Sequence, residues 1–188
     1  MSDSKSKIWT IPNLMSFFRI LLVPVFIVAY LKTERDIAVW PIVILIISGL
    51  TDLFDGLIAR KFNMVSDLGK MLDPIADKLT QISVIACLAI RFNQLLLLLV
   101  VYIVKELAII VGGLVMLKSK KQVPSARWFG KVSTFEFYLA MALLLVFPNM
   151  DSVYITALVV LTLGLTLFSL FMYAFQFFRT PTKKGENK

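Results

Sequence analysis

Long apolar runs separated by short links constrain the fold of this chain more than any other feature. A helix that crosses a bilayer needs about 20 predominantly apolar residues. Six stretches meet that requirement, at residues 14–31, 37–60, 68–91, 94–117, 130–148 and 153–178. The runs are too long and too continuous for the alternating strands of a membrane β-barrel. The sequence therefore predicts an all-α, polytopic membrane protein with six transmembrane helices.

The composition indicates a single membrane domain over residues 1–188. Hydrophobic residues make up 59% of the chain, against about 45–50% in soluble domains. The polar start, which contains Trp9, is expected to form a short N-terminal interfacial segment or an ordinary frayed terminus rather than a cleavable signal peptide. The chain has no histidine and one cysteine, Cys87. A Ser–His–Asp triad, a histidine metal site and an intrachain disulfide are therefore excluded.

Basic residues set the expected orientation in the membrane. The formal charge of +8 indicates contacts with anionic membrane lipids rather than with nucleic acid. If both termini are cytoplasmic, fourteen basic residues of the termini and links lie inside, and only Lys32, Arg35 and Arg91 lie outside. This bias predicts cytoplasmic termini. The link between the second and third runs, around Arg60 to Lys70, is then cytoplasmic as well.

Four aspartates lie near this link, in the second and third predicted spans. Asp52 and Asp55 are three residues apart. Asp73 and Asp77 are four apart. Each pair therefore lies on one helix face, with Cβ atoms about 5–6 Å apart. The short link makes the two spans antiparallel neighbours, so the carboxylates are expected to converge. An aspartate costs about 2.5–3.5 kcal/mol at the bilayer centre, and the group therefore needs cationic partners.

Two kinds of cation could offset this charge. Without histidine or thiolate, clustered carboxylates favour hard ions, Mg²⁺ or Mn²⁺, and two such ions would form a clamp for phosphoryl transfer. The alternative is a structural salt-bridge network with Arg60, Lys70 and Lys78. Arg19, in the first span, is expected either to face this site or to extend to the interface. An ion-coupled transporter is a competing class of function, but its acids would be spread through several spans.

Small residues accompany the aspartates. Gly56, Ala59 and Gly69 predict a groove between the helices that a nucleotide could enter, or ordinary close helix packing. Residues 52–77 read D-x-x-D-G-x-x-A-R-x₈-G-x-x-x-D-x-x-x-D. This pattern resembles the signature of the CDP-alcohol phosphatidyltransferase family. All eight fixed residues are present: Asp52, Asp55, Gly56, Ala59, Arg60, Gly69, Asp73 and Asp77.

The resemblance implies a reaction and a set of roles. In this family a hydroxyl attacks the diphosphate of a CDP-linked donor, here CDP-diacylglycerol, and CMP leaves. Asp77 matches the general base. The implied residues are Asp52, Asp55, Asp73 and Asp77 for two Mg²⁺ or Mn²⁺ ions, and Asp52, Gly56, Ala59, Arg60 and Gly69 for the CDP donor. The resemblance also implies a homodimer in a bacterial cytoplasmic membrane, with the active site facing the cytoplasm.

The residues define the acceptor less closely. Glycerol 3-phosphate is the first expectation, and its phosphate would need basic residues. The candidates are Lys105, Arg127 and Lys131. Lys105 could equally form an intramembrane ion pair with Glu106. Members that use glycerol 3-phosphate usually carry Arg-Glu at this place, and lysine lacks the two-pronged phosphate geometry of arginine. The segment FGKVSTF is also similar to cardiolipin synthases of the family, so phosphatidylglycerol is the alternative acceptor, with serine or inositol phosphate after it.

Overall fold

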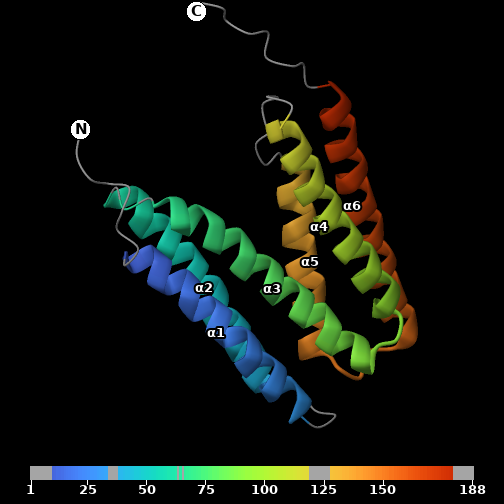
Figure 1. Ribbon diagram of the computed structural model, residues 1–188. Helices are drawn as coiled ribbons and strands as arrows, with labels where there is room; N and C mark the ends of the chain where they lie inside the picture. Colours follow the sequence, from blue (N-terminus) through green and yellow to red (C-terminus); the bar gives the residue numbers. More distant parts are fainter. Residues whose placement is uncertain (1–9, 34–37, 63, 65, 119–127, 180–188) are drawn as a thin grey trace, which may run out of the picture. The chain divides into compact units, whose positions relative to one another are not determined.

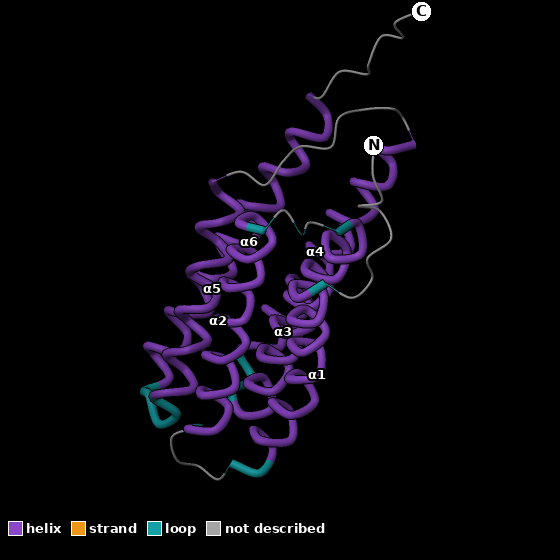
Figure 2. The backbone as a smooth tube through the Cα atoms, turned by 90° about the vertical axis from the view of Figure 1, so that its left-hand side faces the viewer, coloured by secondary structure: helices purple, strands orange, loops and turns teal. Residues whose placement is uncertain are grey.

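The structure is a computed structural model that describes residues 10–33, 38–62, 64, 66–118 and 128–179. The described part contains six helices and no strand (Figures 1 and 2). They are α1 (Ile11–Leu31), α2 (Val39–Lys61), α3 (Asp67–Arg91), α4 (Leu95–Lys118), α5 (Trp128–Val146) and α6 (Ser152–Arg179). The all-α prediction and its six runs are confirmed. The predicted interfacial segment before Thr10 lies outside the described residues.

Five of the helices are long and apolar enough to cross a membrane: α1, α2, α4, α5 and α6. The third, α3, has 25 residues and is also long enough to span. Its sequence, however, concentrates charged side chains in the half that follows the α2–α3 link, which lowers its mean hydropathy. The chain is therefore a multi-pass membrane protein in which α3 is the least apolar helix.

The chain divides into two compact units. The first contains α1, α2, α3 and residues 144–149. The second contains residues 92–143 and the chain from residue 150 onward.

Helix α1 is the centre of the first unit, because it packs against both α2 and α3. It begins with a side-chain cap, in which Thr10 Oγ1 accepts a hydrogen bond from the Asn13 N–H at 3.4 Å. The start of α1, the end of α2 and the start of α3 lie at the same end of this unit (Figure 1). A hydrogen bond from Ser66 Oγ to Asn13 Oδ1, at 2.7 Å, connects the link before α3 to α1.

In the second unit, α4 packs against α6, and ring contacts join the helices to α5. Tyr102 of α4 stacks on Phe137 of α5 with ring centroids 5.4 Å apart. Phe129 of α5 meets Tyr173 of α6 edge to face at 5.0 Å. A buried polar contact joins α5 and α6, where Thr162 Oγ1 donates to Glu136 Oε1 at 2.8 Å.

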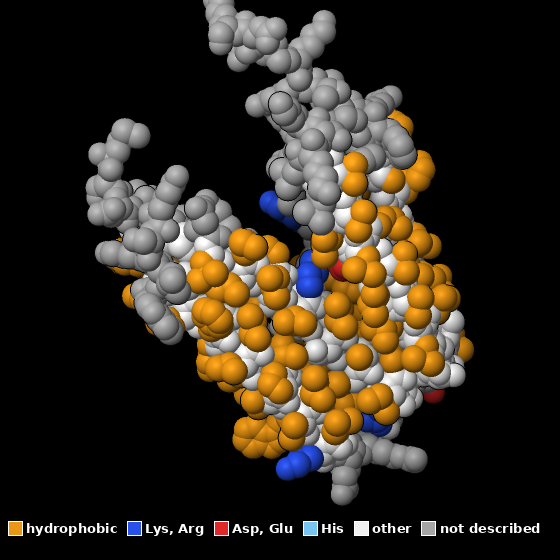
Figure 3. Space-filling view, in the orientation of Figure 1, with side chains coloured by type: hydrophobic (Ala, Val, Ile, Leu, Met, Phe, Trp, Pro, Cys, Tyr) orange, Lys and Arg blue, Asp and Glu red, His pale blue; other side chains and the backbone are white. Residues whose placement is uncertain are grey.

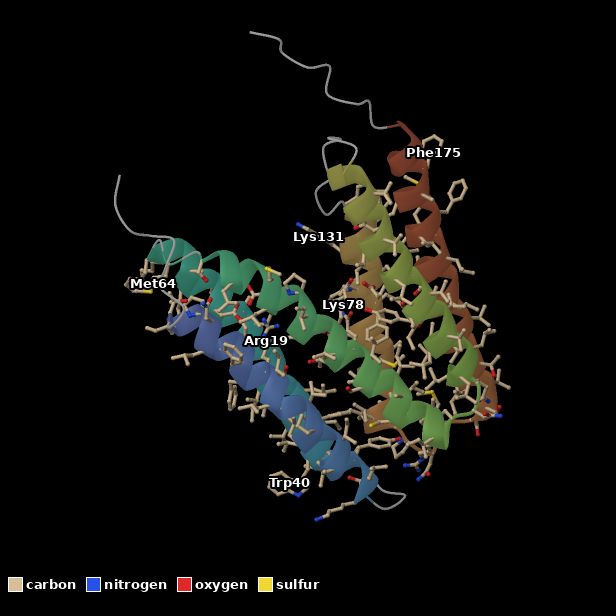
Figure 4. All side chains as sticks on the ribbon, in the orientation of Figure 1. Arg19, Trp40, Met64, Lys78, Lys131 and Phe175 are labelled. Atoms are coloured by element: carbon tan, nitrogen blue, oxygen red, sulfur yellow. The ribbon has the colours of Figure 1, made fainter. Side chains whose placement is uncertain are left out.

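The outer surface of the helices is apolar. Hydrophobic side chains cover most of the visible face of the described residues (Figure 3), and many large ones on every helix are exposed. Soluble monomers rarely expose such continuous apolar area, so this surface suits lipid. Trp40, exposed at the start of α2, lies at the opposite end of the first unit from Met64 (Figure 4). Tryptophan at a helix end is typical of the membrane interface.

Candidate active site

The four aspartates of the signature converge on the guanidinium group of Arg19. Arg19 Nη1 lies 2.6 Å from Asp52 Oδ1 and 3.3 Å from Asp77 Oδ1. Arg19 Nη2 lies 3.2 Å from Asp55 Oδ2 and 3.4 Å from Asp73 Oδ1. Each terminal nitrogen therefore joins one aspartate of α2 to one of α3. The predicted convergence of the carboxylates is observed, and of the two predicted placements of Arg19 the one that faces the site is correct.

The site is deepest at Arg19 and Asp55, whose side chains are 2% and 3% exposed. The carboxylates of Asp52, Asp73 and Asp77 are between 39% and 49% exposed. The cluster thus has a closed side, formed by α1 and Asp55, and an open side that a ligand can approach. Figure 4 places Arg19 on α1, in the part of the first unit nearer Met64 than Trp40.

Helix α1 carries the polar face that receives the aspartates. Asn13, Ser16 and Arg19 follow one another at three-residue spacing, which places them along one side of a helix. All three are buried. Ser16 Oγ donates to Pro12 O at 3.0 Å and also contacts Asp73 Oδ1. Sequence reasoning weighed Arg19 but overlooked Asn13 and Ser16, although polar residues every third position in an apolar span were a signal for this face.

Gly69 allows α3 to approach this face closely. Its N–H donates to Ser66 Oγ at 3.0 Å. A Cβ atom at Gly69 would lie 2.6 Å from Asn13 Oδ1 and 3.2 Å from Ser66 Oγ. Gly69 of the signature is therefore packed closely against α1. Its predicted contact with the CDP donor stays a prediction.

Replacing Gly69 by alanine is expected to lower the melting temperature, because the new methyl group collides with a buried Asn13 side chain already held by Ser66. Crowding of this kind typically costs about 1–3 kcal/mol. Thermal unfolding in detergent measures the effect. Gly49→Ala is the matched control, since a Cβ at that position has nothing within 4 Å and alanine is the better helix former. Equal melting temperatures for the two variants would contradict the packing role of Gly69.

The structure describes the other residues that were predicted to bind the CDP donor less completely. Gly56 and Ala59 lie on α2 and are partly buried. Arg60 is the next residue of that helix, but its side chain lies outside the described part of the structure, as does that of Lys70. Lys78 Nζ donates to Gln81 Oε1 at 3.3 Å. Among the described side chains, Arg19 forms ion pairs with all four carboxylates, and the predicted salt-bridge network did not include it.

The predicted acceptor residues belong to the second unit. Lys105 and Glu106 are both buried, and Lys105 Nζ lies 3.1 Å from Glu106 Oε1. The same ammonium group lies 4.6 Å from the centroid of the Tyr102 ring. The predicted ion pair is confirmed, and the role of Lys105 in acceptor binding stays a prediction. Lys131 is exposed on the first turn of α5, and Arg127 lies outside the described residues.

By their chemistry the carboxylates suit a hard divalent cation. Carboxylate oxygens are the ligands that Mg²⁺ and Mn²⁺ prefer, and Arg19 offsets only one of the four negative charges. Within the described residues, no three Asp, Glu or Cys side chains are grouped so that they could hold one ion as they stand. The reason is visible in the distances, since the carboxylates are directed at the guanidinium group.

The signature and its geometry have a counterpart among known proteins. A sequence model described as CDP-alcohol phosphatidyltransferase matches residues 9–177 of the chain. The chain belongs to the CDP-alcohol phosphatidyltransferase family. The match covers all four aspartates, Arg19 and helices of both units. Family membership makes the chain a phosphatidyltransferase of phospholipid biosynthesis, and it leaves the transporter alternative without support.

Relatives within this family carry two different names. A cardiolipin synthase (CMP-forming) of Streptomyces coelicolor is 33% identical over 142 residues, which cover 74% of this chain and 66% of that protein. A CDP-diacylglycerol–glycerol-3-phosphate 3-phosphatidyltransferase of Rickettsia felis is 34% identical over 137 residues, 72% of this chain and 74% of the relative. A protein of the same name from Salmonella typhimurium is 30% identical over 169 residues, 88% and 93% of the two chains.

Proposed function

We propose that this phosphatidyltransferase moves the phosphatidyl group of CDP-diacylglycerol to glycerol 3-phosphate in a reaction that depends on Mg²⁺ or Mn²⁺. The observation that carries the proposal is the convergence of Asp52, Asp55, Asp73 and Asp77 within reach of one guanidinium group. Such a concentration of carboxylate charge matches a diphosphate only if cations lie between them. The same four residues would hold those ions, which supply charge neutralisation on the diphosphate when bound.

The chain's own residues divide the chemistry. The carboxylate of Asp77 takes the proton of the acceptor hydroxyl, whose oxygen forms a bond to the phosphorus of the phosphatidyl group. The bond from that phosphorus to the oxygen of the CMP moiety breaks, and CMP leaves with that oxygen. Asp77 is suited to this role because it lies on the open side of the cluster. By their match to the signature, Gly56, Ala59 and Arg60 border the cytidine and its phosphates.

The acceptor is chosen from two candidates that the relatives' names provide. Glycerol 3-phosphate is favoured, because the relatives that align over 88–89% of this chain and 90% or more of their own carry that name. Phosphatidylglycerol is the second candidate. It is supported by the cardiolipin synthase relative and by the ion pair of Lys105 with Glu106, which leaves that lysine a weaker attraction for an additional anionic phosphate.

The acceptor is tested with purified protein, labelled CDP-diacylglycerol and Mg²⁺ or Mn²⁺. Parallel reactions contain glycerol 3-phosphate, phosphatidylglycerol, serine or inositol phosphate, and the lipid product and CMP are both measured. We expect CMP release with glycerol 3-phosphate and formation of phosphatidylglycerophosphate. Release only with phosphatidylglycerol would replace the acceptor, and no release with any alcohol would overturn the proposed reaction.

We also propose that both termini and the active site face the cytoplasm of a bacterial cell, and that the chain forms a homodimer. The orientation is supported by the basic residues of the links, and a reporter fused to the C-terminus would read it. The dimer rests on resemblance to the family, and cross-linking in membranes would detect it.

A further inference from the structure

The guanidinium group of Arg19 lies where the two aspartate pairs meet. Nη1 contacts Asp52 of α2 and Asp77 of α3, and Nη2 contacts Asp55 of α2 and Asp73 of α3. A single side chain of α1 thus bridges the other two helices twice. Because α1 also packs against both of them, the position of the guanidinium group is set by the fold of the first unit.

The buried guanidinium group of Arg19 depends on the carboxylates around it for its stability. Its side chain is 2% exposed, so it has left most of its hydration shell, and it depends on the carboxylates for stabilisation. Among the described side chains, Arg19 forms ion pairs with all four carboxylates, and its one positive charge can neutralise only part of their charge. Arg19 Nε is buried and has no hydrogen-bond acceptor among the described residues. Arg19 by itself therefore neutralises only part of the charge of the cluster, and its own hydrogen-bonding capacity is only partly used.

We infer that Arg19 is a resident cation of the active site, which holds the aspartate pairs together in the metal-free protein and competes with divalent ions for them. The inference rests on the proposed metal site. Within the described residues the carboxylates surround the guanidinium rather than a common point, so ions and the guanidinium group compete for the same carboxylates. Arg19 is a positioning residue, and its charge sets how tightly the metals bind.

Arg19 is inferred both to stabilise the metal-free protein and to compete with metal ions. Its removal should therefore lower the stability of the metal-free protein and raise its affinity for metal. Without Arg19, four like charges repel one another across α2 and α3, and the metal-free protein loses stability. The same loss removes a positive charge from the neighbourhood of the incoming ions, so metal binding strengthens. A side chain that merely supported the fold would behave differently, because its removal would loosen the ligands and weaken metal binding.

The experiment compares Arg19→Gln with wild type in the full-length protein, purified in detergent. Mn²⁺ binding is followed by the electron paramagnetic resonance signal of the free ion, and thermal unfolding is measured in EDTA and in saturating Mn²⁺. We expect Arg19→Gln to bind Mn²⁺ about tenfold more tightly, to melt earlier than wild type in EDTA, and to gain more from Mn²⁺ than wild type does.

Two further variants separate charge from position. Arg91→Gln makes the same substitution at the far end of α3, about 21 Å along the helix from Asp77, where Arg91 Nη2 donates to Asn149 Oδ1. It should leave Mn²⁺ affinity unchanged. Arg19→Lys keeps the charge but cannot bridge both pairs, so it should bind Mn²⁺ like wild type while melting earlier in EDTA. If Arg19→Gln unfolds without metal, its affinity is measured by chelator competition from the Mn²⁺-loaded protein.

The outcomes distinguish this inference from the proposed function. If wild type binds Mn²⁺ and Arg19→Gln binds it equally or more weakly, the competing role of Arg19 is wrong while the metal site stands. If wild type binds no Mn²⁺, both the metal site and the role of Arg19 are wrong. Equal tightening in Arg19→Gln and Arg91→Gln would also overturn the inference, since the effect would then come from net charge alone.

Discussion

Replacing Asp77 by asparagine is expected to reduce CMP release to background while the helical fold remains. Asparagine has the size of aspartate but cannot take up the proton of the acceptor hydroxyl. General bases contribute about 10²–10⁴-fold to a rate, and Asp77 is also a proposed metal ligand, so the loss should reach at least that range. The initial rate of CMP release from CDP-diacylglycerol, with acceptor and Mg²⁺ in excess, measures it.

The fold should tolerate this change because Arg19 keeps three carboxylate partners, Asp52, Asp55 and Asp73, and the excess of negative charge falls. Thermal unfolding checks this directly. Asp151→Asn is the matched control, since Asp151 is an exposed residue immediately before α6, and asparagine serves equally well at a helix start. The initial rate of CMP release by Asp151→Asn should equal that of the wild-type protein. An Asp77→Asn protein that retained a tenth or more of the wild-type rate would exclude Asp77 as the base.

Removal of divalent ions is expected to abolish activity completely and reversibly. Arg19 offsets only one of the four carboxylate charges, and carboxylates without further cations would repel a diphosphate. Divalent ions held by the four aspartates would supply the positive charge that removes this barrier. CMP release should fall to background after exhaustive treatment with EDTA and return when Mg²⁺ or Mn²⁺ is added in excess.

A control separates metal removal from other effects of the chelator. EDTA already saturated with Mg²⁺ supplies the same chelator at the same concentration but cannot deplete Mg²⁺, and it should leave the rate in Mg²⁺ unchanged. Metal content is verified by elemental analysis of the treated protein. Full activity in a protein shown to be free of Mg²⁺ and Mn²⁺ would remove the ions from the mechanism and leave Arg19 as the cation that faces the donor.

The helices could be predicted because the sequence of each segment decides by itself whether that segment forms a helix in the membrane. An apolar run of about 20 residues in a bilayer must satisfy its backbone within the segment, whatever its neighbours are. The predicted runs accordingly agree with α1 to α6 to within a few residues at each end. The aspartate pairs were predictable for the same reason, since spacings of three and four residues place Asp52 with Asp55 and Asp73 with Asp77 on any helix.

The partners of the aspartates were harder to predict from the sequence. From the sequence, the two aspartate helices were expected to be antiparallel neighbours, with Arg60, Lys70 and Lys78 as salt-bridge partners. Whether Arg19 faces the site was left open. In the structure α1 packs against both helices and supplies Arg19, which lies 33 residues before Asp52 in the sequence. Spacing along the chain carries no information about which helix packs between two others. A similar limit applied to Gly69, whose close neighbour Asn13 comes from a different helix.

The membrane class, the helices, the family and the acidic residues of the site could be predicted from the order of the amino acids, because apolar length and short-range spacing act within single segments. The meeting of the four carboxylates at Arg19 and the ion pair of Lys105 with Glu106 became apparent from the packed helices. These contacts depend on how whole helices pack and on where buried charges find partners. The aspartates could thus be predicted from the chain, whereas the sequence left two placements open for Arg19 and helix packing selected one of them.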